Sequence, residues 1–380
     1  VTEEFHPGFR NSVAAYTVSL LNPTVIRELE LARHGLRPQD VGVVPGAAGG
    51  PKGLILGPLD RFIFGEWLPQ STQPVHLVGA SIGAWRMATA CLSDAVPAFE
   101  RLEHDYIRQH YELAPGQKRP TPDHVSELFG QNLKAFYGGK VGEVLHHPRY
   151  KLHVVTSRGR HVLGREHALR TPLGYLGAFL TNTVHRKAMG AWLERVVFSS
   201  PDVAAGTSHA ALPFATGDYR TRQVALSEAN FNAALQASCS IPFVLKAIHD
   251  IPGAPPGAYW DGGITDYHLH LNYSAKTSQG LVLYPHFQKN VVPGWLDKSL
   301  KWRHGSTHFL DTTIVLAPDP KWVKTLPNGK LPDRTDFTHY GQDLQARVKA
   351  WSAATAASRQ LADEFGEWVA RGDLAAVLPL

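Results

Sequence analysis

The sequence predicts an α/β protein in which helices pack on a parallel sheet, and three observations support this class. Two strand–loop–helix units follow one another over residues 41–92, which is typical of a parallel sheet. Of the 380 residues, 43% are hydrophobic and 19% are charged, so the chain can bury a sizeable core. No internal repeat and no long linker interrupts the chain. We therefore expect a single domain over residues 1–380.

The first unit begins with an apolar run at residues 41–44, which predicts a short strand. This strand enters a Gly-rich loop at residues 46–53, and a stretch of helical character follows at residues 54–67. The second unit begins with another apolar run at residues 75–78. A short turn and an Ala-rich helix that continues to about residue 92 complete it. Both units place a glycine-containing loop between a strand and a helix.

The remaining elements are predicted from weaker patterns. Helices are expected at residues 23–35, 98–113, 226–240 and 341–372, and strands at residues 152–156, 195–198 and 314–316. A surface loop rich in proline is expected at residues 114–122. Residues 172–180 are apolar but interrupted by glycine, so they are expected to form either a core segment or a mobile lid.

The formal net charge of +5 makes the protein mildly basic, and the excess is spread along the chain. Such a distribution favours contact with anionic surfaces without indicating nucleic acid. No zinc-finger, ribonucleoprotein or helix-turn-helix signature is present, so we expect no nucleic-acid partner. Cys91 and Cys239 both lie in apolar, helix-like contexts, which favours buried free thiols over a disulfide bridge.

The first five residues include two glutamates and lack the apolar stretch of a signal peptide. No apolar run of the sequence is long enough to cross a bilayer. We therefore expect a cytoplasmic protein, with peripheral contact at membranes as an addition. A mature chain whose signal had been removed would begin in the same way, so secretion stays an alternative.

The turn of the second unit carries the clearest indication of chemistry, because residues 79–83 read Gly-Ala-Ser-Ile-Gly. A G-x-S-x-G pattern between a strand and a helix is that of a nucleophile elbow. Gly79 and Gly83 allow a sharp turn, which lifts the hydroxyl of Ser81 above the sheet edge and beside the helix N-terminus. Ser81 is thus the predicted nucleophile of an acyl transfer. The alternative is an ordinary strand–helix turn that contains a serine.

The Gly-rich loop at residues 46–53 is the predicted source of hydrogen-bond donors for an oxyanion. Its glycines let backbone N–H groups approach the negative charge that develops on the substrate. A phosphate-binding P-loop is a competing interpretation, but Lys52 is followed by Gly53 rather than by Ser or Thr. The glycine spacing of a dinucleotide site is also absent, and a structural turn stays an alternative.

Two kinds of residue are candidates for the base that activates Ser81. A histidine would complete a Ser-Asp-His triad of the α/β-hydrolase type. Histidines downstream of Ser81 that could take this role are His268, His270, His286, His304, His308 and His339. The other candidate is Asp261, which follows an aromatic pair and precedes two glycines. An aspartate is a weak base at its usual pKa, so this option requires a site that raises the pKa. An alternative for the Asp-Gly-Gly segment is a simple turn.

Four segments together resemble the patatin-like phospholipase family. Residues 49–53 read Gly-Gly-Pro-Lys-Gly, and residues 79–83 form the elbow. Residues 233–242 read Ala-Ala-Leu-Gln-Ala-Ser-Cys-Ser-Ile-Pro, and residues 261–263 read Asp-Gly-Gly. The segments occur in the order in which the family has them, and the resemblance covers about residues 40–265.

The resemblance implies a three-layer α/β/α sandwich with a mainly parallel central sheet. It also implies hydrolysis of lipid acyl esters by a Ser–Asp dyad, with Ser81 as the nucleophile and Asp261 as the base, and without a metal ion or an organic cofactor. The loop residues that it assigns to the oxyanion are Gly49, Gly50, Lys52 and Gly53. Pro51 has no N–H group to donate. Ala48 stands where the family loop has its first glycine.

The resemblance fades after Asp261. Residues 284–340 mix aromatic and basic side chains, and the densest part holds Trp295, Lys298, Lys301, Trp302, Arg303 and His304. Such a mixture suits a cap or surface insertion at a lipid–water interface, where rings and cations meet anionic headgroups. A solvated loop whose tryptophans anchor it to the core is an equal alternative.

The predicted function is that of a serine acyl-ester hydrolase that forms an acyl-enzyme. Phospholipids, lysolipids and neutral esters are the expected substrates, and thioesters and polyesters suit the same chemistry. One rival function is an α/β-hydrolase with a catalytic histidine. The other rival is a non-catalytic lipid-binding protein with an inactive elbow.

Overall fold

The computed structural model describes residues 2–6, 9–12, 16–19, 31, 35–113, 117, 119–372 and 377–378. The strands are β1 (Thr2–His6), β2 (Phe9–Ser12), β3 (Tyr16–Ser19), β4 (Val41–Gly46), β5 (Val75–Ala80), β6 (Tyr150–Gly159), β7 (Leu193–Ser199), β8 (Thr221–Ala225), β9 (Ile248–His249), β10 (Ala258–Asp261), β11 (Leu281–Pro285), β12 (Thr313–Pro318) and β13 (Val377–Leu378). The α-helices are α3 (Gly57–Phe62), α4 (Ile82–Ala90), α5 (Ala95–Arg108), α6 (Pro122–Tyr137), α7 (Val141–Leu145), α8 (Arg170–Val184), α9 (Phe231–Cys239), α10 (Gly263–Asp266), α11 (Pro320–Val323), α12 (Thr335–Tyr340), α13 (Leu344–Ala357) and α14 (Arg359–Arg371). Three of the 3₁₀ helices are η2 (Gly50–Leu56), η8 (Trp295–Asp297) and η9 (Lys301–Arg303).

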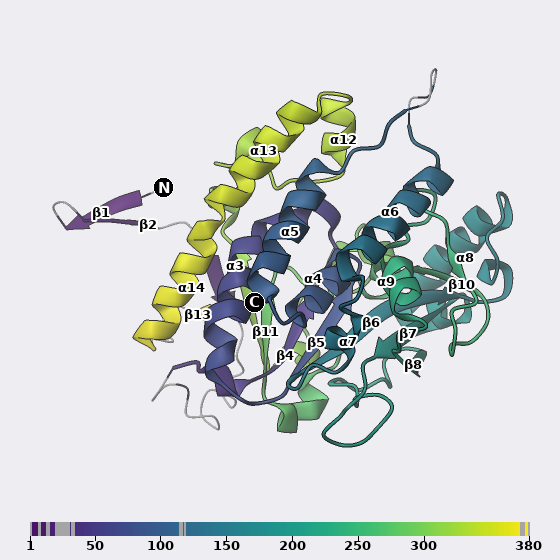
Figure 1. Cartoon of the computed structure of the whole chain (residues 1–380), viewed down its shortest axis with the longest axis horizontal. Helices are drawn as coiled ribbons and strands as arrows, with labels where there is room; N and C mark the ends of the chain where they lie inside the picture. The colour runs from purple at the N-terminus through teal and green to yellow at the C-terminus, as the bar shows by residue number, and fades with distance from the viewer. Residues whose placement is uncertain are drawn as a thin grey trace.

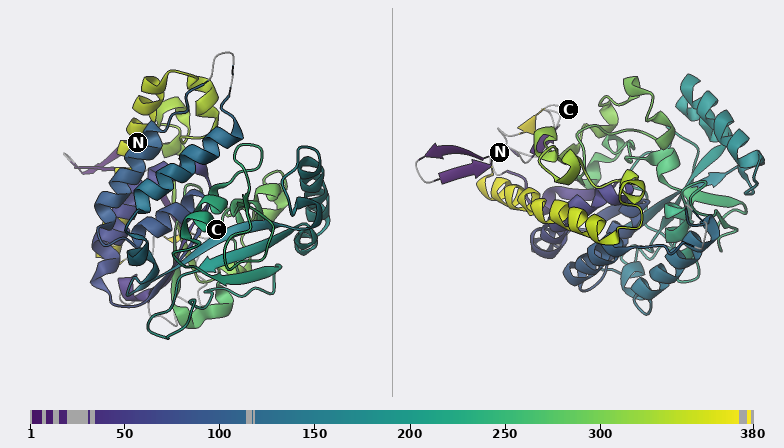
Figure 2. Two further views of the ribbon diagram at one scale, coloured as in Figure 1. Left: turned by 45° about the vertical axis from the view of Figure 1, so that its right-hand side comes forward. Right: turned by 90° about the horizontal axis from the view of Figure 1, so that it is seen from above.

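A sheet of 11 strands forms the centre of the molecule (Figure 1). Its middle is parallel, in the order β12-β11-β4-β5-β6, and antiparallel pairs join β3, β7, β9 and β10 to it. In the view from above, α3 to α6 lie on one side of this sheet and much of the green chain between β10 and α12 lies on the other (Figure 2). The last two helices, α13 and α14, pack against α5 and α3 on the first side. The protein is therefore a three-layer α/β/α sandwich, which confirms the predicted fold class.

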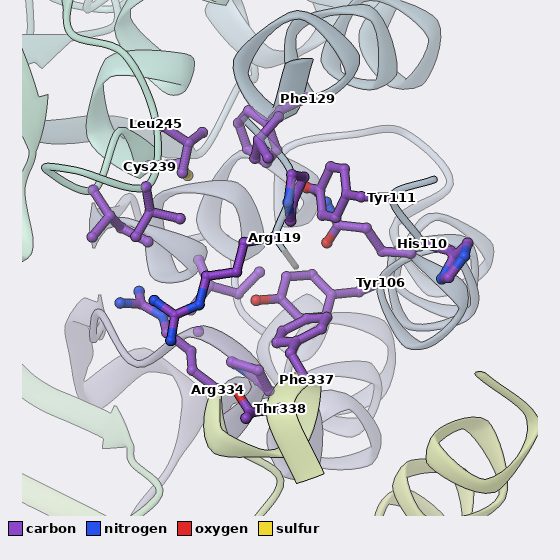
Figure 3. A pocket seen from close by; sticks show the side chains of 18 of the residues that line it. Tyr106, His110, Tyr111, Arg119, Phe129, Cys239, Leu245, Arg334, Phe337 and Thr338 are labelled. Atoms are coloured by element: carbon purple, nitrogen blue, oxygen red, sulfur yellow. The ribbon is translucent and has the colours of Figure 1, made fainter. Parts of the chain in front are cut away.

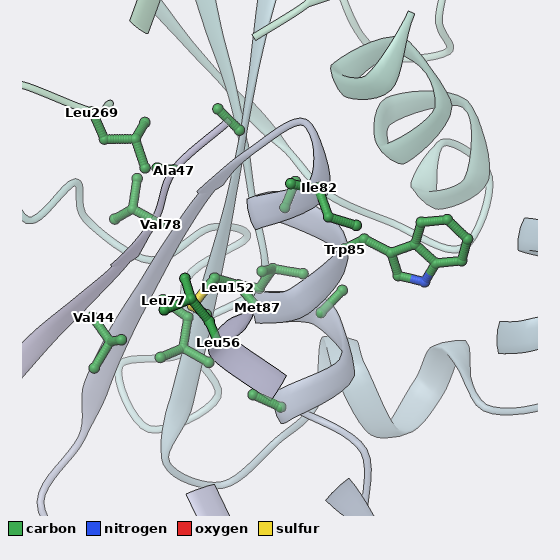
Figure 4. Packing of buried hydrophobic residues seen from close by; sticks show 14 of the residues in the cluster. Val44, Ala47, Leu56, Leu77, Val78, Ile82, Trp85, Met87, Leu152 and Leu269 are labelled. Atoms are coloured by element: carbon green, nitrogen blue, oxygen red, sulfur yellow. The ribbon is translucent and has the colours of Figure 1, made fainter. Parts of the chain in front are cut away.

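The parallel strands and α4 form the core beneath the site. Every residue of β4 is buried, and β5 is buried at all but one position, so both read as continuous apolar runs. Every residue of α4 is buried as well, and Figure 4 shows Met87 of this helix beside Leu77 of β5. Close packing on the sheet thus fixes the start of α4, where the predicted elbow lies.

Several predicted elements have other bounds in the structure. The stretch expected to be helical over residues 54–67 is divided among η2, α3 and a π-helical turn at Ile63–Trp67. Pro58 explains part of this division, because it lacks the N–H group that a continuous helix needs. The helix expected over residues 341–372 is two helices, α13 and α14, which adjoin at Ser358. The hydroxyl of Ser358 donates to the backbone carbonyl of Thr355 and so competes with the helical pattern.

Other expectations are met more closely. The strands expected at residues 152–156, 195–198 and 314–316 lie within β6, β7 and β12. The helix expected at residues 98–113 corresponds to α5, which begins three residues earlier and ends at Arg108. The helix expected from residue 226 begins later as α9, because the Asn230 side chain accepts the N–H of Ser227 and closes a turn there. Both cysteines are free and buried, as predicted. The helix expected at residues 23–35 falls almost entirely outside the described residues.

The ambiguous apolar stretch at residues 172–180 lies inside α8. The inner face of this helix packs on a small apolar cluster around Trp260, through Tyr175 and Ala178. Its other face carries leucines that are exposed to solvent. The segment is thus half core and half surface. Of the helices in the described part of the chain, none has the length and apolar character that crossing a membrane requires.

Candidate active site

The turn after β5 brings Ser81 to the carboxyl edge of the sheet. Ser81 has φ 56° and ψ −130°, a backbone conformation that L side chains rarely adopt. A Cβ atom on Gly83 would lie 1.8 Å from the carbonyl oxygen of Gly46, and one on Gly79 would lie 2.3 Å from the following helix. Both positions need glycine because backbone passes so close. The turn therefore has the geometry expected of a nucleophile elbow.

Ser81 meets Asp261 because β5 and β10 share one edge of β6. The parallel strand β5 ends where Ala80 pairs with Val155 of β6. The antiparallel strand β10 ends where Asp261 pairs with Thr156, the next residue of β6. Since β7 occupies the opposite edge of β6 along both stretches, the ends of β5 and β10 point toward each other. The hydroxyl of Ser81 donates to Oδ2 of Asp261 at 2.7 Å.

The environment of Asp261 suits a base. Its Oδ1 accepts the backbone N–H of Gly263 at 2.7 Å, which fixes the orientation of the carboxylate. Burial raises the pKa of Asp261, although the hydrogen bond from Ser81, the charge of Arg334 and the N–H of Gly263 act in the opposite direction. A raised pKa makes a carboxylate a stronger proton acceptor, which is the condition that the sequence argument required.

An ion-pair cluster holds the chain that follows Asp261. Asp266 of α10 accepts hydrogen bonds from Arg195 of β7 at 2.6 and 2.7 Å, and both side chains are fully buried. Arg195 also binds Asp218 at 3.1 Å. Truncating one member of such a cluster would leave a buried charge without its partner. The cluster therefore anchors α10, and with it the turn that carries Asp261, to the sheet.

Ser238 of α9 ties the two turns of the site together. Its hydroxyl donates to the carbonyl oxygen of Val155 at 2.7 Å and accepts the backbone N–H of Ser81 at 3.0 Å. Its own carbonyl oxygen accepts the N–H of Gly262 at 3.1 Å. Ser238 belongs to the segment at residues 233–242, in which the sequence indicated no role for it. The surrounding segment also holds Gln236 and Ser240, so no feature of the sequence sets Ser238 apart.

The Gly-rich loop reaches the site through its first glycines. Gly49 lines a cavity together with Ser81 and Asp261, and Gly50 lines a second cavity that also includes Ser81. Both stand at the start of η2, where N–H groups have no acceptor within the helix. Gly50 also has φ +57°, which favours glycine. The loop thus places Gly49 and Gly50 in the lining of the cavities beside Ser81.

Two other loop positions behave differently. Ala48 donates its N–H to the carbonyl oxygen of Tyr267 at 2.9 Å, and its methyl group lies 2.6 Å from where Gly263 would carry a Cβ. The alanine thus fills space that Gly263 leaves open. Gly53, which was assigned to the oxyanion, packs against Ile82 and lines neither cavity beside Ser81. Neither cavity that includes Ser81 includes Gly53, so the assignment of Gly53 to the oxyanion stays a prediction.

Ser81 stands where two cavities meet. The larger cavity has a volume of about 500 Å³. Its lining is mainly apolar and aromatic and includes Trp85, Phe129, Ile241, Phe243, Val244, Leu245 and Phe337. Figure 3 shows Phe129 and Leu245 at one end of this cavity, and Phe337 beside Arg334 at the other. A space of this size and character can accept an acyl chain.

The smaller cavity has a volume of about 200 Å³ and gathers three cations: Lys52, Lys298 and Arg334. Burial and the charges of the other two lower the pKa of Lys298 to about 8, and its Nζ lies 4.0 Å from the ring centre of Tyr267. Burial lowers the pKa of Lys52 as well. Cations held close together out of water favour an anion as a ligand. Arg334 was missed in the sequence, where nothing links it to the motifs.

The aromatic and basic segment at residues 284–340 divides between the cavity and the surface. Trp295 and Lys298 line the smaller cavity. Arg303 is bound to the buried Asp297 at 3.0 Å. Trp302 points away from the core, with 73% of its surface exposed. One part of this segment thus forms a wall of the site, and another part faces solvent.

The downstream histidines lie away from Ser81. None of the six lines either cavity, and each is a described residue. Burial lowers the pKa of His286 to about 3 and that of His270 to about 4, so both are neutral. The Nε2 atom of His304 lies 2.9 Å from the carbonyl oxygen of Asp297. The geometry therefore brings a carboxylate, and none of these imidazoles, to the hydroxyl of Ser81.

The fold and the site together define an α/β/α protein with a buried Ser–Asp pair at a nucleophile elbow. No family model matches the chain. A search of solved structures finds VipD from Legionella pneumophila, with 11% sequence identity and a TM-score of 0.35 over 98% of this chain and 76% of that chain. A score at this level does not identify a shared fold. Within the described residues, no group of three or more His, Cys, Asp or Glu side chains could hold a metal ion.

Proposed function

We propose that the protein is a patatin-like serine acyl-ester hydrolase that uses a Ser81–Asp261 dyad. The observation that carries this proposal is the 2.7 Å hydrogen bond between the two side chains at a strained elbow. Gly49 and Gly50, whose N–H groups stand at the start of η2, line the cavities that Ser81 also lines. A nucleophile, a base and oxyanion donors therefore surround one place where an ester carbonyl can bind.

The reaction runs in two halves. The Oγ of Ser81 attacks the ester carbonyl carbon while its proton passes to Oδ2 of Asp261, and the oxyanion forms beside the loop N–H groups. When the tetrahedral intermediate collapses, Asp261 returns the proton to the leaving alcohol, and the acyl group stays on Ser81. Water then attacks the acyl-enzyme while Asp261 takes a proton from it. When this second intermediate collapses, the bond to Oγ of Ser81 breaks, Asp261 returns the proton to Oγ, and the carboxylic acid is released.

The two cavities support an acyl ester with a negative charge near the ester group. The apolar cavity accommodates the chain, and the three cations of the smaller cavity favour an anionic group such as the phosphate of a phospholipid or a lysophospholipid. With a neutral ester, Lys52, Lys298 and Arg334 would share only the two carboxylates of the cavity lining, Asp261 and Asp333. Neutral esters are therefore the poorer substrates in this proposal.

Covalent labelling tests the dyad. A fluorophosphonate reagent should modify Ser81 in the wild type, as read by mass spectrometry of the labelled peptide. Ser81→Ala should abolish labelling. Ser240→Ala is the matched control, because this buried serine donates to a backbone carbonyl of its own helix rather than to Asp261. Folded protein that is not modified at Ser81, or labelling that persists in Ser81→Ala, would exclude the proposal.

A matched substrate pair tests the headgroup. We expect a lysophosphatidate to be hydrolysed with a higher kcat/KM than the monoacylglycerol with the same chain. Arg334→Gln should lower kcat/KM for the anionic ester by about 10- to 150-fold, because a charge-assisted hydrogen bond contributes about 1.5–3 kcal/mol. The neutral ester should respond much less. Equal losses for both substrates would show that Arg334 does not select the anion.

A further inference from the structure

The outer face of α8 carries an apolar stripe, which consists of Leu169, Leu173, Leu176, Leu180 and Val184. These residues recur at spacings of four, three, four and four positions, so they lie along one side of the helix. Between 54 and 83% of the surface of each is exposed. They are half of the ten large apolar side chains that are exposed in the described part of the chain. An apolar patch of this kind marks an interaction site rather than a scattered set of surface residues.

The inner face of the same helix is buried, through Thr171, Gly174, Tyr175, Ala178 and Asn182. A surface helix normally has a polar outer face, and a helix that is apolar on both sides is normally enclosed. Figure 1 and Figure 2 show α8 at the edge of the molecule, on the side away from α13 and α14. The outer stripe therefore lies at the periphery and is open to a partner.

The stripe continues toward the apolar cavity of the active site. Phe243 and Val244 line that cavity, yet 55% and 48% of their surfaces are exposed, so they stand at its mouth. The ring of Phe243 contacts Tyr175 of α8 at a centroid distance of 5.9 Å. Whatever covers the stripe is thus brought close to the route by which an acyl chain would reach Ser81.

An exposed tryptophan and several cations border the other end of the stripe. Arg303 donates to the side chain of Asn182 and to the backbone carbonyl of Thr183, so η9 is held against the last turn of α8. Trp302 and Lys301 are exposed on this short helix. A tryptophan and lysine beside leucines form the combination that sits at the boundary between lipid headgroups and acyl chains.

We propose that the α8 stripe, together with Phe243, Val244 and Trp302, docks the protein on an anionic lipid surface. Charge complementarity favours this occupant. Of the six Arg or Lys within residues 158–192, three are paired with carboxylates, and the other three, Arg160, Arg170 and Lys187, form no ion pair with the described residues. A second copy of the chain fits less well. A symmetric pair through this face would set the same cations opposite each other.

Vesicle flotation of the full chain tests this docking. Vesicles of phosphatidylcholine alone are compared with vesicles that also contain phosphatidylglycerol, at low and high salt. The test variant replaces Leu173, Leu176 and Leu180 by serine, and the matched control is Val203→Ser, since Val203 is equally exposed at 59% but lies outside α8. Both are made in the Ser81→Ala background, so that no lipid is hydrolysed during the measurement.

We expect binding of the Ser81→Ala protein to anionic vesicles, weaker binding to neutral ones, and a loss of about tenfold or more in the triple serine variant. The Val203→Ser control should bind as the parent does. Absence of vesicle binding by the parent, or unchanged binding by a folded triple variant, would overturn the proposal. A dimer in light scattering that the triple substitution dissociates would also overturn it, because a second copy would then be the occupant. Hydrolysis of a soluble ester by the triple variant with Ser81 restored reports separately on the proposed activity.

Discussion

Replacing Asp261 by asparagine would separate the chemistry of the site from its shape. Asparagine has nearly the same volume and keeps an oxygen that can accept the N–H of Gly263, but it cannot take the proton of Ser81. A positioned general base typically contributes about 10²- to 10⁴-fold to the rate. At about 1.4 kcal/mol per tenfold, this range corresponds to about 3–5 kcal/mol of activation free energy. We expect kcat/KM of Asp261→Asn to fall by that factor.

The same substitution should leave the fold at least as stable. Because burial raises the pKa of Asp261, the native state binds this proton more tightly than the unfolded chain does. The resulting stabilisation is full below the unfolded pKa, near 3.8, and is lost as the pH rises through the higher folded pKa. At neutral pH the buried, ionised carboxylate therefore costs stability. The amide of the Asp261→Asn variant carries no charge to desolvate, so the melting temperature should not decrease.

Hydrolysis of a soluble nitrophenyl ester and thermal denaturation at neutral pH measure the two effects. Asp363→Asn, at an exposed position of α14, is the control and should keep full activity. The double variant Ser81→Ala/Asp261→Asn should be no less active than Ser81→Ala alone, since the two residues act as a unit. A folded Asp261→Asn protein with more than about one tenth of the wild-type kcat/KM would refute the dyad.

Three further substitutions probe the same site, and a fourth, Gly142→Ala in α7, is the control for Gly83→Ala. Lys298→Met removes a positive charge and should therefore raise the pKa of Asp261. The acid limb of the pH profile of kcat/KM for a neutral ester should then shift to higher pH. An unchanged acid limb would contradict the coupling between the two residues. Gly83→Ala should destabilise the protein by about 3 kcal/mol or more in denaturant titration, because its Cβ would overlap the carbonyl oxygen that ends β4. Gly142→Ala, with open space around the new methyl group, should be neutral or stabilising by up to about 1 kcal/mol. Ser238→Ala should cost about 1–3 kcal/mol of stability, because the backbone N–H of Ser81 loses its acceptor. The same loss should slow the labelling of Ser81 by the fluorophosphonate. Labelling at the wild-type rate would show that this contact is dispensable.

Features that depend on neighbours in the chain were predictable. The elbow follows from residues 79–83, because a strand, a glycine-flanked serine and a helix-forming stretch are all local. The parallel middle of the sheet follows from continuous apolar runs such as residues 41–44. The same reasoning failed where side chains compete with the backbone. The expected helix over residues 341–372 is interrupted at Ser358, where the hydroxyl donates to the carbonyl oxygen of Thr355. Helix propensity summed over a long segment does not detect the effect of a single side chain.

The sequence by itself determined the fold class and indicated Ser81, since apolar runs and glycine positions act through near neighbours. Only the tertiary structure decided what surrounds that serine. The meeting of Ser81 with Asp261 results from two strands that end on one edge of β6. Arg334 lines both cavities beside Ser81, whereas Gly53 lines neither of them. Both facts likewise depend on how distant segments pack. The physical reason is that these contacts join residues that lie far apart in the chain. Sheet order and burial bring such residues together, and neither produces a periodic pattern in the sequence that would reveal the contact.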